Sequence, residues 1–386
     1  MRAMPAKIIF FSVFTLITCL ISFYIFLRGL QSIPPDSSLR SPYTILFWMV
    51  ALSFICGRLL EAILPSFVVD ALVWIGSFWM AAMLYFLLAV VALDLVRLVN
   101  HFIPFYPASV TDNYAQAKYI TGASVMGLVG LALLVGHINS ILPRVVTLEL
   151  PIPRKESKLD RLDIVAVSDV HLGTIVGRAR FDHIVDMINR MNPDLILLPG
   201  DIVDEDLAPV IRQNLGGALR NLRSRFGVFA ITGNHEFIGG VDDACAYLAG
   251  HNIKVLRDES VKIADSFVII GRDDRSKGGF TGQARKSLSE LMESVDRRYP
   301  SILMDHQPFA LGEAADQGID LQISGHTHDG QLWPINYIVN RIYEVAWGYK
   351  KIAKTHYYVS DGVGTWGPPV RLGNRPEIVH LRLQFN

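Results

Sequence analysis

Four long apolar runs in the first 142 residues limit what this chain can fold into. None of the runs contains Asp, Glu, Lys or Arg, and each is long enough, or nearly so, to cross the bilayer core of about 30 Å as a helix. Of the 386 residues, 51% are hydrophobic, a high share for a soluble protein. We therefore expect an N-terminal bundle of four membrane-spanning helices, over residues 8–27, 43–57, 71–93 and 119–142.

The charges around these runs predict their orientation. Arg2 and Lys7 precede the first run, which is longer than the apolar part of a signal peptide and has no small-residue cleavage site after it, so we expect it to remain as a span. Four spans place both chain ends on one side of the membrane. Lys and Arg are more frequent on that side, because the other side carries only Arg28, Arg40, Arg97 and Lys118. The positive-inside rule then places the rest of the chain in the cytoplasm.

Overall charge and cysteine content exclude some functions. The formal net charge is zero, whereas a nucleic-acid-binding protein normally carries a basic surplus, so we expect no nucleic-acid partner. The three cysteines form no CxxC motif, which argues against a zinc–cysteine site. Membrane lipids are the expected partners of the apolar runs, and the sequence does not indicate an oligomeric state.

The remainder of the chain has the pattern of an α/β domain. We interpret residues 1–143 as the transmembrane region, 144–161 as a proline-containing charged linker and 162–386 as the second domain. Short apolar runs alternate there with helical periodicity, which predicts a β-sheet sandwich flanked by helices. The expected strands are 162–167, 195–198, 228–231, 254–256, 261–263, 267–270, 301–304, 321–323, 356–359 and 378–383, and the expected helices are 181–191, 210–222, 242–249 and 284–295.

Metal-binding residue types follow five of these strands. The most distinctive segment is ISGHTHDGQ at 323–331, in which two histidines are one residue apart. Asp, Asn and Gly are also common turn formers, and a turn-forming role would explain any one of these loops. It explains poorly why all five loops carry metal-ligand residue types. Strand ends of a parallel sheet lie along one edge, so the side chains are expected to meet. They are Asp169, His171, Asp201, Asn234, His235, His306, His326 and His328.

The chemistry of this set favours two metal ions. Carboxylate, amide and imidazole ligands together suit manganese, iron or zinc better than calcium or magnesium alone. Two such ions about 3.5–4 Å apart can share a hydroxide and clamp phosphoryl oxygens. We therefore expect two divalent metal ions, a pair suited to act on a phosphoryl group.

The ordered motifs resemble those of the calcineurin-like metallophosphoesterases, over roughly 162–383. The tail, with DGVG at 361–364 and PEI at 376–378, is similar to the membrane-associated bacterial branch, which implies the bacterial inner (plasma) membrane. The resemblance implies in-line attack by a metal-bridging hydroxide, without a covalent intermediate. It assigns a first metal to Asp169, His171, Asp201 and His328, a second to Asp201 as bridge with Asn234, His306 and His326, and the catalytic role to His235, which would stabilise the transition state or protonate the leaving oxygen.

Three neighbouring residues are not assigned to either metal. By the same resemblance, Asp204 and Glu236 would support the ligands or their loops. Asp329 departs from the pattern, because this branch often has glycine after the histidine pair. The departure affects loop shape or substrate contacts rather than the metals.

The substrate is suggested by residues 332–347, an apolar segment beside the histidine pair. It could form a membrane-facing lip, or it could be ordinary core that covers the sheet edge. With four spans nearby, the lip predicts a lipid-linked phosphoester or pyrophosphate, and the resemblance suggests UDP-diacylglucosamine. The alternatives are a general phosphodiesterase or phosphatase acting on soluble substrates, and a membrane sensor that binds without turnover.

Overall fold

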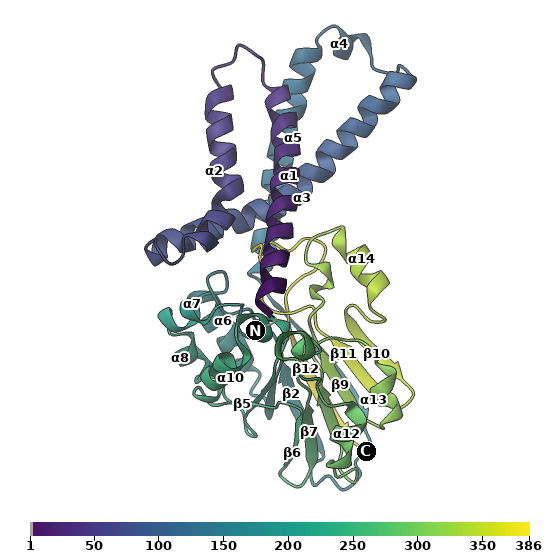
Figure 1. Ribbon diagram of the computed structural model, residues 1–386. Helices are drawn as coiled ribbons and strands as arrows, with labels where there is room; N and C mark the ends of the chain where they lie inside the picture. The colour runs from purple at the N-terminus through teal and green to yellow at the C-terminus, as the bar shows by residue number, and fades with distance from the viewer. Residues whose placement is uncertain (1–2) are drawn as a thin grey trace. The chain divides into compact units, whose positions relative to one another are not determined.

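The computed structural model describes residues 3–386, with side chains from residue 12 onward (Figure 1). It divides into two units. A helical unit comprises the chain up to His137 together with Gly367–Val370, and an α/β unit comprises Ile138–Trp366 and Arg371–Asn386. Arg2, used above in the charge count, lies outside the described residues.

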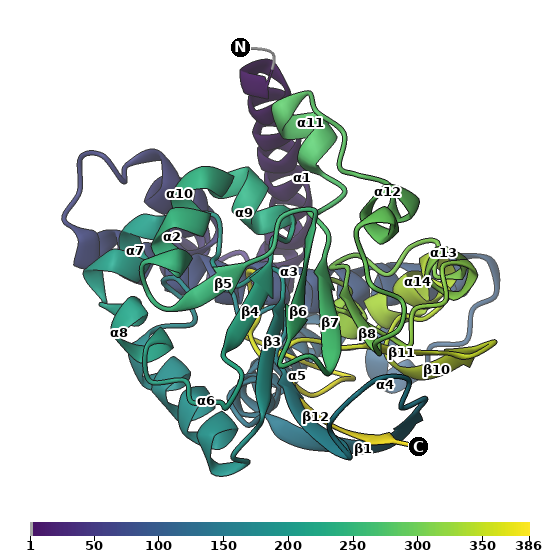
Figure 2. The ribbon, with the colours of Figure 1, turned by 90° about the horizontal axis from the view of Figure 1, so that it is seen from below.

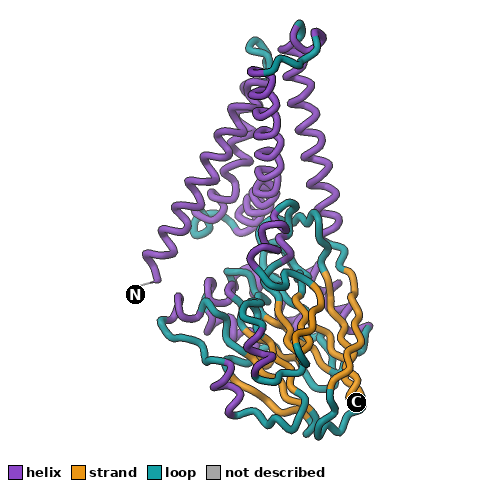
Figure 3. The backbone as a smooth tube through the Cα atoms, turned by 90° about the vertical axis from the view of Figure 1, so that its right-hand side faces the viewer, coloured by secondary structure: helices purple, strands orange, loops and turns teal. Residues whose placement is uncertain are grey.

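The helical unit contains the four expected spans. Among the described residues, four of its helices are long and apolar enough to cross a membrane, which confirms the prediction. The predicted ranges lie inside these helices except for residues 141–142. Trp79 and Ala82 of one helix pack with Ile25, Ala51 and Val129 of the other three in a small core. The helices are α1 Ala3–Ser32, α2 Arg40–Leu59, α3 Ser66–Phe102, the short α4 Ala108–Thr111 and α5 Tyr114–Ser140 (Figure 3).

The α/β unit is built on two six-stranded sheets, as the sheet sandwich prediction requires. The first has the order β1-β12-β2-β3-β4-β5 and the second β10-β11-β9-β8-β7-β6. The strands are β1 Arg144–Ile152, β2 Arg161–Ala166, β3 Leu195–Pro199, β4 Val228–Ile231, β5 Ile253–Val255, β6 Glu259–Ile263, β7 Phe267–Gly271, β8 Ser301–Met304, β9 Leu321–Ser324, β10 Gly348–Ile352, β11 Thr355–Val359 and β12 Glu377–Phe385.

The central strands of both sheets are parallel, which brings their carboxyl ends to one edge. β2, β3, β4 and β5 run parallel in the first sheet, and β7, β8, β9 and β11 do so in the second. Side chains from both sheets, including Ile164, Leu197, Ile302 and Ile323, form one buried core between them. Such strands are apolar on both faces because each sheet is also covered on its outer side.

Helices cover the outer faces of the sandwich (Figure 2). α6 (Arg178–Arg190) buries Phe181, Ile184, Val185 and Ile188, the stripe expected of an amphipathic helix. α12 (Leu288–Glu293) contributes Leu288, Leu291 and Met292 to a second core against the other sheet. The remaining helices are α7 Leu207–Arg212, α8 Leu215–Leu219, α9 Asn234–Gly239, α10 Val241–Ala249, α11 Lys277–Thr281, α13 Gly312–Asp316, the 3₁₀ turn η1 His328–Gly330 and α14 Ile335–Ile342.

Several elements differ from the sequence prediction. Residues 144–152, interpreted as part of a linker, form β1, which pairs in parallel with β12. Pro151 is tolerated because β1 is an edge strand, where a missing backbone donor disrupts no ladder on the open side. The helix expected over 210–222 is divided into α7 and α8 at Asn214, whose φ is +51°. The helix expected over 284–295 is confined to α12, where the Ser287 side chain caps the N-terminus.

Candidate metal centre

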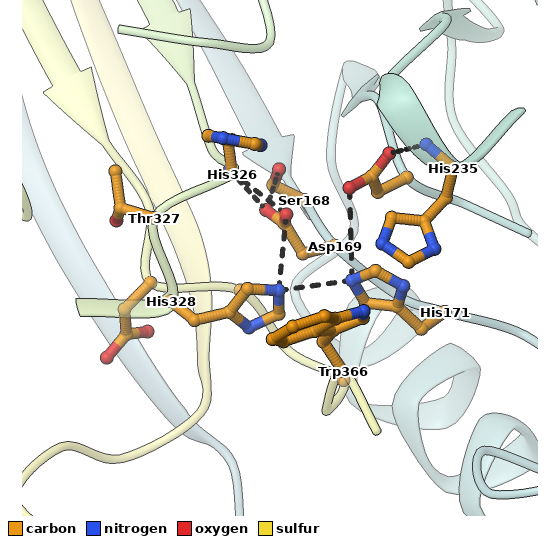
Figure 4. A network of polar contacts seen from close by, with 12 residues as sticks. Ser168, Asp169, His171, His235, His326, Thr327, His328 and Trp366 are labelled. Atoms are coloured by element: carbon orange, nitrogen blue, oxygen red, sulfur yellow. Dashed lines mark hydrogen bonds and ion pairs between the residues drawn. The ribbon is translucent and has the colours of Figure 1, made fainter. Parts of the chain in front are cut away.

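The loops after β2, β3, β4, β8 and β9 carry all the side chains that the sequence analysis singled out, and the structure brings them together. Figure 4 shows five of them, Asp169, His171, His235, His326 and His328. Among the described residues, three groups of three ligand types form, each with donor atoms within 4.8 Å of one another. The first is Asp169, His171 and His328, and the second is Asp201, His306 and His326, so loops from both sheets contribute to each of these two. The third, His171, Asp204 and His235, comes from loops of the first sheet alone and shares His171 with the first group.

In the first group the donor atoms face a common point. The Nε2 atoms of His171 and His328 lie 3.1 Å apart, and Oδ1 of Asp169 lies 3.5 Å from Nε2 of His328. Burial, reinforced by the charges of His171 and Arg371, lowers the pKa of His328 well below its usual value. A neutral imidazole is the form that binds metal.

The second group includes the amide of Asn234. Its Oδ1 lies 2.8 Å from Nδ1 of His326, and Nε2 of His306 lies 3.1 Å from Oδ2 of Asp201. The same Oδ2 atom lies 4.0 Å from Nε2 of His171, a member of the first group. Asp201 therefore stands between the two groups, the position that a bridging carboxylate requires.

The contacts of His306 test whether a cation fits this site. Its Nδ1 lies 2.8 Å from the Pro199 carbonyl, to which only a protonated nitrogen can donate. Its Nε2 is buried and faces the Asp201 carboxylate. Burial alone would lower the pKa of His306, but the charge of Asp201 outweighs it and raises the pKa well above its usual value. A positive charge is therefore favoured at Nε2, and a metal ion there would take the place of the proton. The residues present therefore fit a metal ion.

The backbone of the ligand loops is held in an uncommon conformation. Five of the predicted ligands have φ between +48° and +73°, which is rare for residues other than glycine and concentrates at functional sites. The ligand loops are also closely packed, because a Cβ on Gly325 would lie 2.2 Å from Oδ2 of Asp169. The five are Asp169, His171, Asp201, His326 and His328.

His235 lies beside the ligands with a carboxylate of its own. Its Nδ1 is 3.1 Å from Oδ1 of Asp204, and its ring stands edge-on to His171, with ring centres 4.6 Å apart. Burial alone would lower the pKa of His235, but the charge of Asp201 and the contact with Asp204 outweigh it and raise the pKa to about 10. His235 is therefore an imidazolium near neutral pH, able to stabilise negative charge or to donate a proton.

Glu236 holds two ligand loops in place. Its buried carboxylate accepts the backbone N–H groups of Asp201, Ile202, Val203 and Gly233 at 2.7–3.1 Å. These contacts fix the loop after β3 to the loop after β4. The loop-supporting role expected for Glu236 agrees with them.

Arg371 was not singled out from the sequence. Its guanidinium is fully buried, donates to the carbonyls of Asp361, Gly362 and Gly364, and lies 3.1 Å from Nδ1 of His328. Its location in the glycine-rich tail is the one sequence feature that could have drawn attention to Arg371, because His328 is remote from it in the sequence.

The apolar segment after the histidine pair lies next to the site, and part of it is exposed: Leu332, Val345 and Ala346 are buried, whereas Trp333, Tyr337, Ile338, Ile342 and Trp347 are exposed. The ring of Tyr343, just after α14, is 6.1 Å from that of His326. Trp366 is 55% exposed, with its ring centre 6.3 Å from that of His235. Asp329 accepts a hydrogen bond from Asn340 of α14, which ties this helix to the metal-site loop.

Comparisons with known proteins decide the family. The family model for calcineurin-like phosphoesterase matches residues 162–330. A protein of Aquifex aeolicus named "Uncharacterized metallophosphoesterase" is 34% identical over 232 residues, which cover 60% of this chain and 88% of that protein. The chain belongs to the calcineurin-like metallophosphoesterases. Its α/β unit is hereafter called the phosphoesterase domain.

Other relatives are longer than the matched region. A Bos taurus protein named "Transmembrane protein with metallophosphoesterase domain" is 37% identical over 269 residues, 65% of this chain and 59% of that protein. A Helicobacter pylori "Uncharacterized metallophosphoesterase" is 34% identical over 232 residues, 58% of this chain and 61% of that protein. The chain thus spans about three fifths of the length of these two relatives.

Proposed function

We propose that this protein is a membrane-anchored phosphoesterase with a dinuclear metal centre. The observation that carries the proposal is the position of Asp201 between two groups of buried ligand atoms, 3.1 Å from His306 and 4.0 Å from His171. A single metal site would not need this second set of imidazoles.

The ligands divide as the geometry groups them. Asp169, His171, Asp201 and His328 would hold one cation, and Asp201 with Asn234, His306 and His326 would hold the other. This donor set suits manganese, iron or zinc. When bound, the pair would supply Lewis-acid activation of water and of the phosphoryl oxygens.

His235 and Asp204 would handle the leaving group. A protonated His235 beside the ligand groups can donate to the oxygen that departs from phosphorus, or stabilise the charge that develops there. Asp204, 3.1 Å from Nδ1, fixes the ring and directs Nε2 as the free donor atom. Because the ligand assignment above gives His235 to neither cation, its loss should reduce turnover without removing metal.

Exposed apolar residues around the site support a lipid-linked substrate. Ile338 and Ile342 are four residues apart on α14, lie on one face of the helix, and are 61% and 58% exposed. Trp333, Tyr337 and Trp347 are also exposed, so the alternative that this segment is ordinary core does not hold for them. An exposed apolar patch beside a hydrophilic site is suited to the acyl part of a lipid. A lipid-linked phosphoester or pyrophosphate, such as UDP-diacylglucosamine, is the substrate we propose.

The proposed setting is the bacterial inner membrane with the phosphoesterase domain on the cytoplasmic side. The excess of Lys and Arg on the side of the N-terminus supports this orientation. A reporter fused to the C-terminus would test it, and an external reporter would contradict it.

Turnover by the full-length, manganese-loaded protein in detergent tests the activity. The substrates are an aryl phosphodiester, nucleotides and UDP-diacylglucosamine, and the variants are Asp201→Asn and His235→Gln. We expect both variants to lose at least a hundredfold in kcat. Binding of substrate without turnover by the wild type would favour a sensor, and unchanged activity in either variant would refute the enzyme mechanism.

A second pair of variants tests the lipid preference. Ile338→Ser with Ile342→Ser removes apolar surface near the site, and Ile211→Ser, at an equally exposed position on α7, is the matched control. We expect the double variant to raise KM for the lipid substrate severalfold and to leave hydrolysis of the aryl diester unchanged. Equal effects on both substrates would contradict a lipid-binding lip.

A further inference from the structure

The helical unit contains a cavity whose walls are strongly basic. It has a volume of about 430 Å³, and its lining includes Arg28 of α1, Arg40 of α2, Arg97 of α3 and Lys118 of α5. Each of the four long helices thus supplies one cation. All four side chains are half-buried rather than extended into solvent.

The four cations lie at one end of the helical unit. Arg28 and Arg40 flank the connection between α1 and α2, and Arg97 and Lys118 flank the connection between α3 and α5. Figures 1 and 3 show both connections at the same end of the helices. In a membrane, this end corresponds to the boundary between acyl chains and headgroups.

The positive charge of the cavity is only partly neutralised. Asp94 forms ion pairs with Arg28 at 2.6 Å and with Arg97 at 2.8 Å, so two guanidinium groups share one carboxylate. Among the described residues, Arg40 and Lys118 form no ion pair. Arg40 donates to the carbonyls of Leu30 and Ile33, and the Lys118 ammonium lies over the Tyr114 ring. Four cations and one carboxylate leave an excess of three positive charges.

The charge and the volume of the cavity suit an anion larger than a single small ion. Half-buried cations that lack a carboxylate partner, such as Arg40 and Lys118, are costly, whereas guanidinium and ammonium groups bind phosphate oxygens well. The volume exceeds the share of one water, about 30 Å³, by an order of magnitude, so it admits more than a single small ion. Exposed apolar residues such as Leu27, Leu95 and Leu98 lie within one turn of the cationic positions, on surfaces suited to acyl chains.

We propose that this cavity binds the phosphate-bearing headgroup of an anionic phospholipid. The site belongs to the helical unit, and none of its lining residues is among the ligand groups of the phosphoesterase domain. The phosphoesterase domain begins after His137. The bound lipid would therefore be a resident ligand of the helical unit and not the molecule being hydrolysed.

Lipid binding to the full-length protein in nanodiscs tests the site. Native mass spectrometry would count retained phosphatidylglycerol against phosphatidylcholine for the wild type and for Arg28→Gln with Lys118→Gln. Each cation near anionic lipid contributes roughly fivefold in affinity, so the double variant should bind phosphatidylglycerol roughly 25-fold more weakly. Arg58→Gln is the matched control, because Arg58 lies near the other end of α2 and does not line the cavity.

Asp94→Asn supplies a test with the opposite sign. Removal of the one carboxylate should increase retention of phosphatidylglycerol, an outcome that misfolding would not produce. Equal loss in the Arg58 control and the double variant, or equal retention of both lipids by the wild type, would overturn the proposal. Displacement of the lipid by millimolar inorganic phosphate, with equal affinity for both, would assign the cavity to a soluble anion and would also overturn it.

Discussion

Nδ1 of His235 lies 3.1 Å from Oδ1 of Asp204, and the same carboxylate oxygen lies 3.6 Å from Nδ1 of His171. One carboxylate therefore orients both the imidazole proposed as proton donor and an imidazole proposed as metal ligand. Burial alone would raise the pKa of Asp204, but contacts with these two histidines lower it, so Asp204 remains ionised. This relationship links the chemistry of His235 to the loop that follows β3.

Replacement of Asp204 by Asn should shift the pH dependence of turnover. The carboxylate stabilises the imidazolium of His235, whose pKa is about 10, so its removal lowers that pKa. Activity that requires protonated His235 is lost as pH rises through this pKa. A lost charge-assisted contact should therefore move the alkaline limb of the kcat profile about one to two pH units lower.

The control for this prediction is Asp182→Asn, which removes an exposed carboxylate paired with Arg178 in α6. Its alkaline limb should coincide with that of the wild type. An Asp204→Asn profile that merely falls in amplitude, without a shift, would mean that Asp204 acts only on the fold of the loop.

Asp201→Asn should lower the metal content. The neutral amide cannot replace a carboxylate that lies between His306 and His171, so at least one of the two ions should be lost. Metal analysis of the purified full-length protein by mass spectrometry would show about two ions in the wild type and one or fewer in the variant. His235→Gln should keep both, and a full complement in Asp201→Asn would contradict a bridging role.

The strand-end motifs could be predicted because their positions depend on local patterns. Short apolar runs mark β2, β3, β4, β8 and β9, and polar residues follow each run directly, so the convergence of parallel strands brings them together. The apolar character of the spans is likewise local, and the structure has helices over all four.

Other features depend on partners far away in the sequence. β1 pairs with β12, more than 200 residues later, and prolines obscure its strand pattern. Arg371 approaches His328 only through the fold of the tail. The basic cavity combines residues from four helices. In the sequence, its four cations entered only the count of charges on each side of the membrane. Long-range contacts of this kind leave no periodic signal.

Glu236→Gln should destabilise the phosphoesterase domain. The amide presents one acceptor oxygen and an NH₂ group to four backbone donors, so at least one buried N–H is left without a partner. We expect a loss of about 3 kcal/mol in the free energy of unfolding, and a melting temperature lower by roughly 5–10 °C. Thermal unfolding of the full chain, followed by fluorescence, would measure it. Glu344→Gln, at an exposed carboxylate paired with Lys350, should melt like the wild type.

Arg371→Lys should weaken metal binding while the positive charge is kept. The guanidinium spans three carbonyls and Nδ1 of His328, whereas the compact lysine ammonium cannot reach all of them at once. Substitution of a residue that hydrogen-bonds to a metal ligand typically lowers metal affinity by about 10–100-fold, and we expect a loss in that range. Titration of the metal-free full-length protein with manganese would measure it, with Arg382→Lys on the exposed face of β12 as control. If the metal affinity is unchanged and the melting temperature falls, Arg371 only stabilises the tail. The substitution would then disturb the contacts with the carbonyls of Asp361, Gly362 and Gly364 without affecting His328.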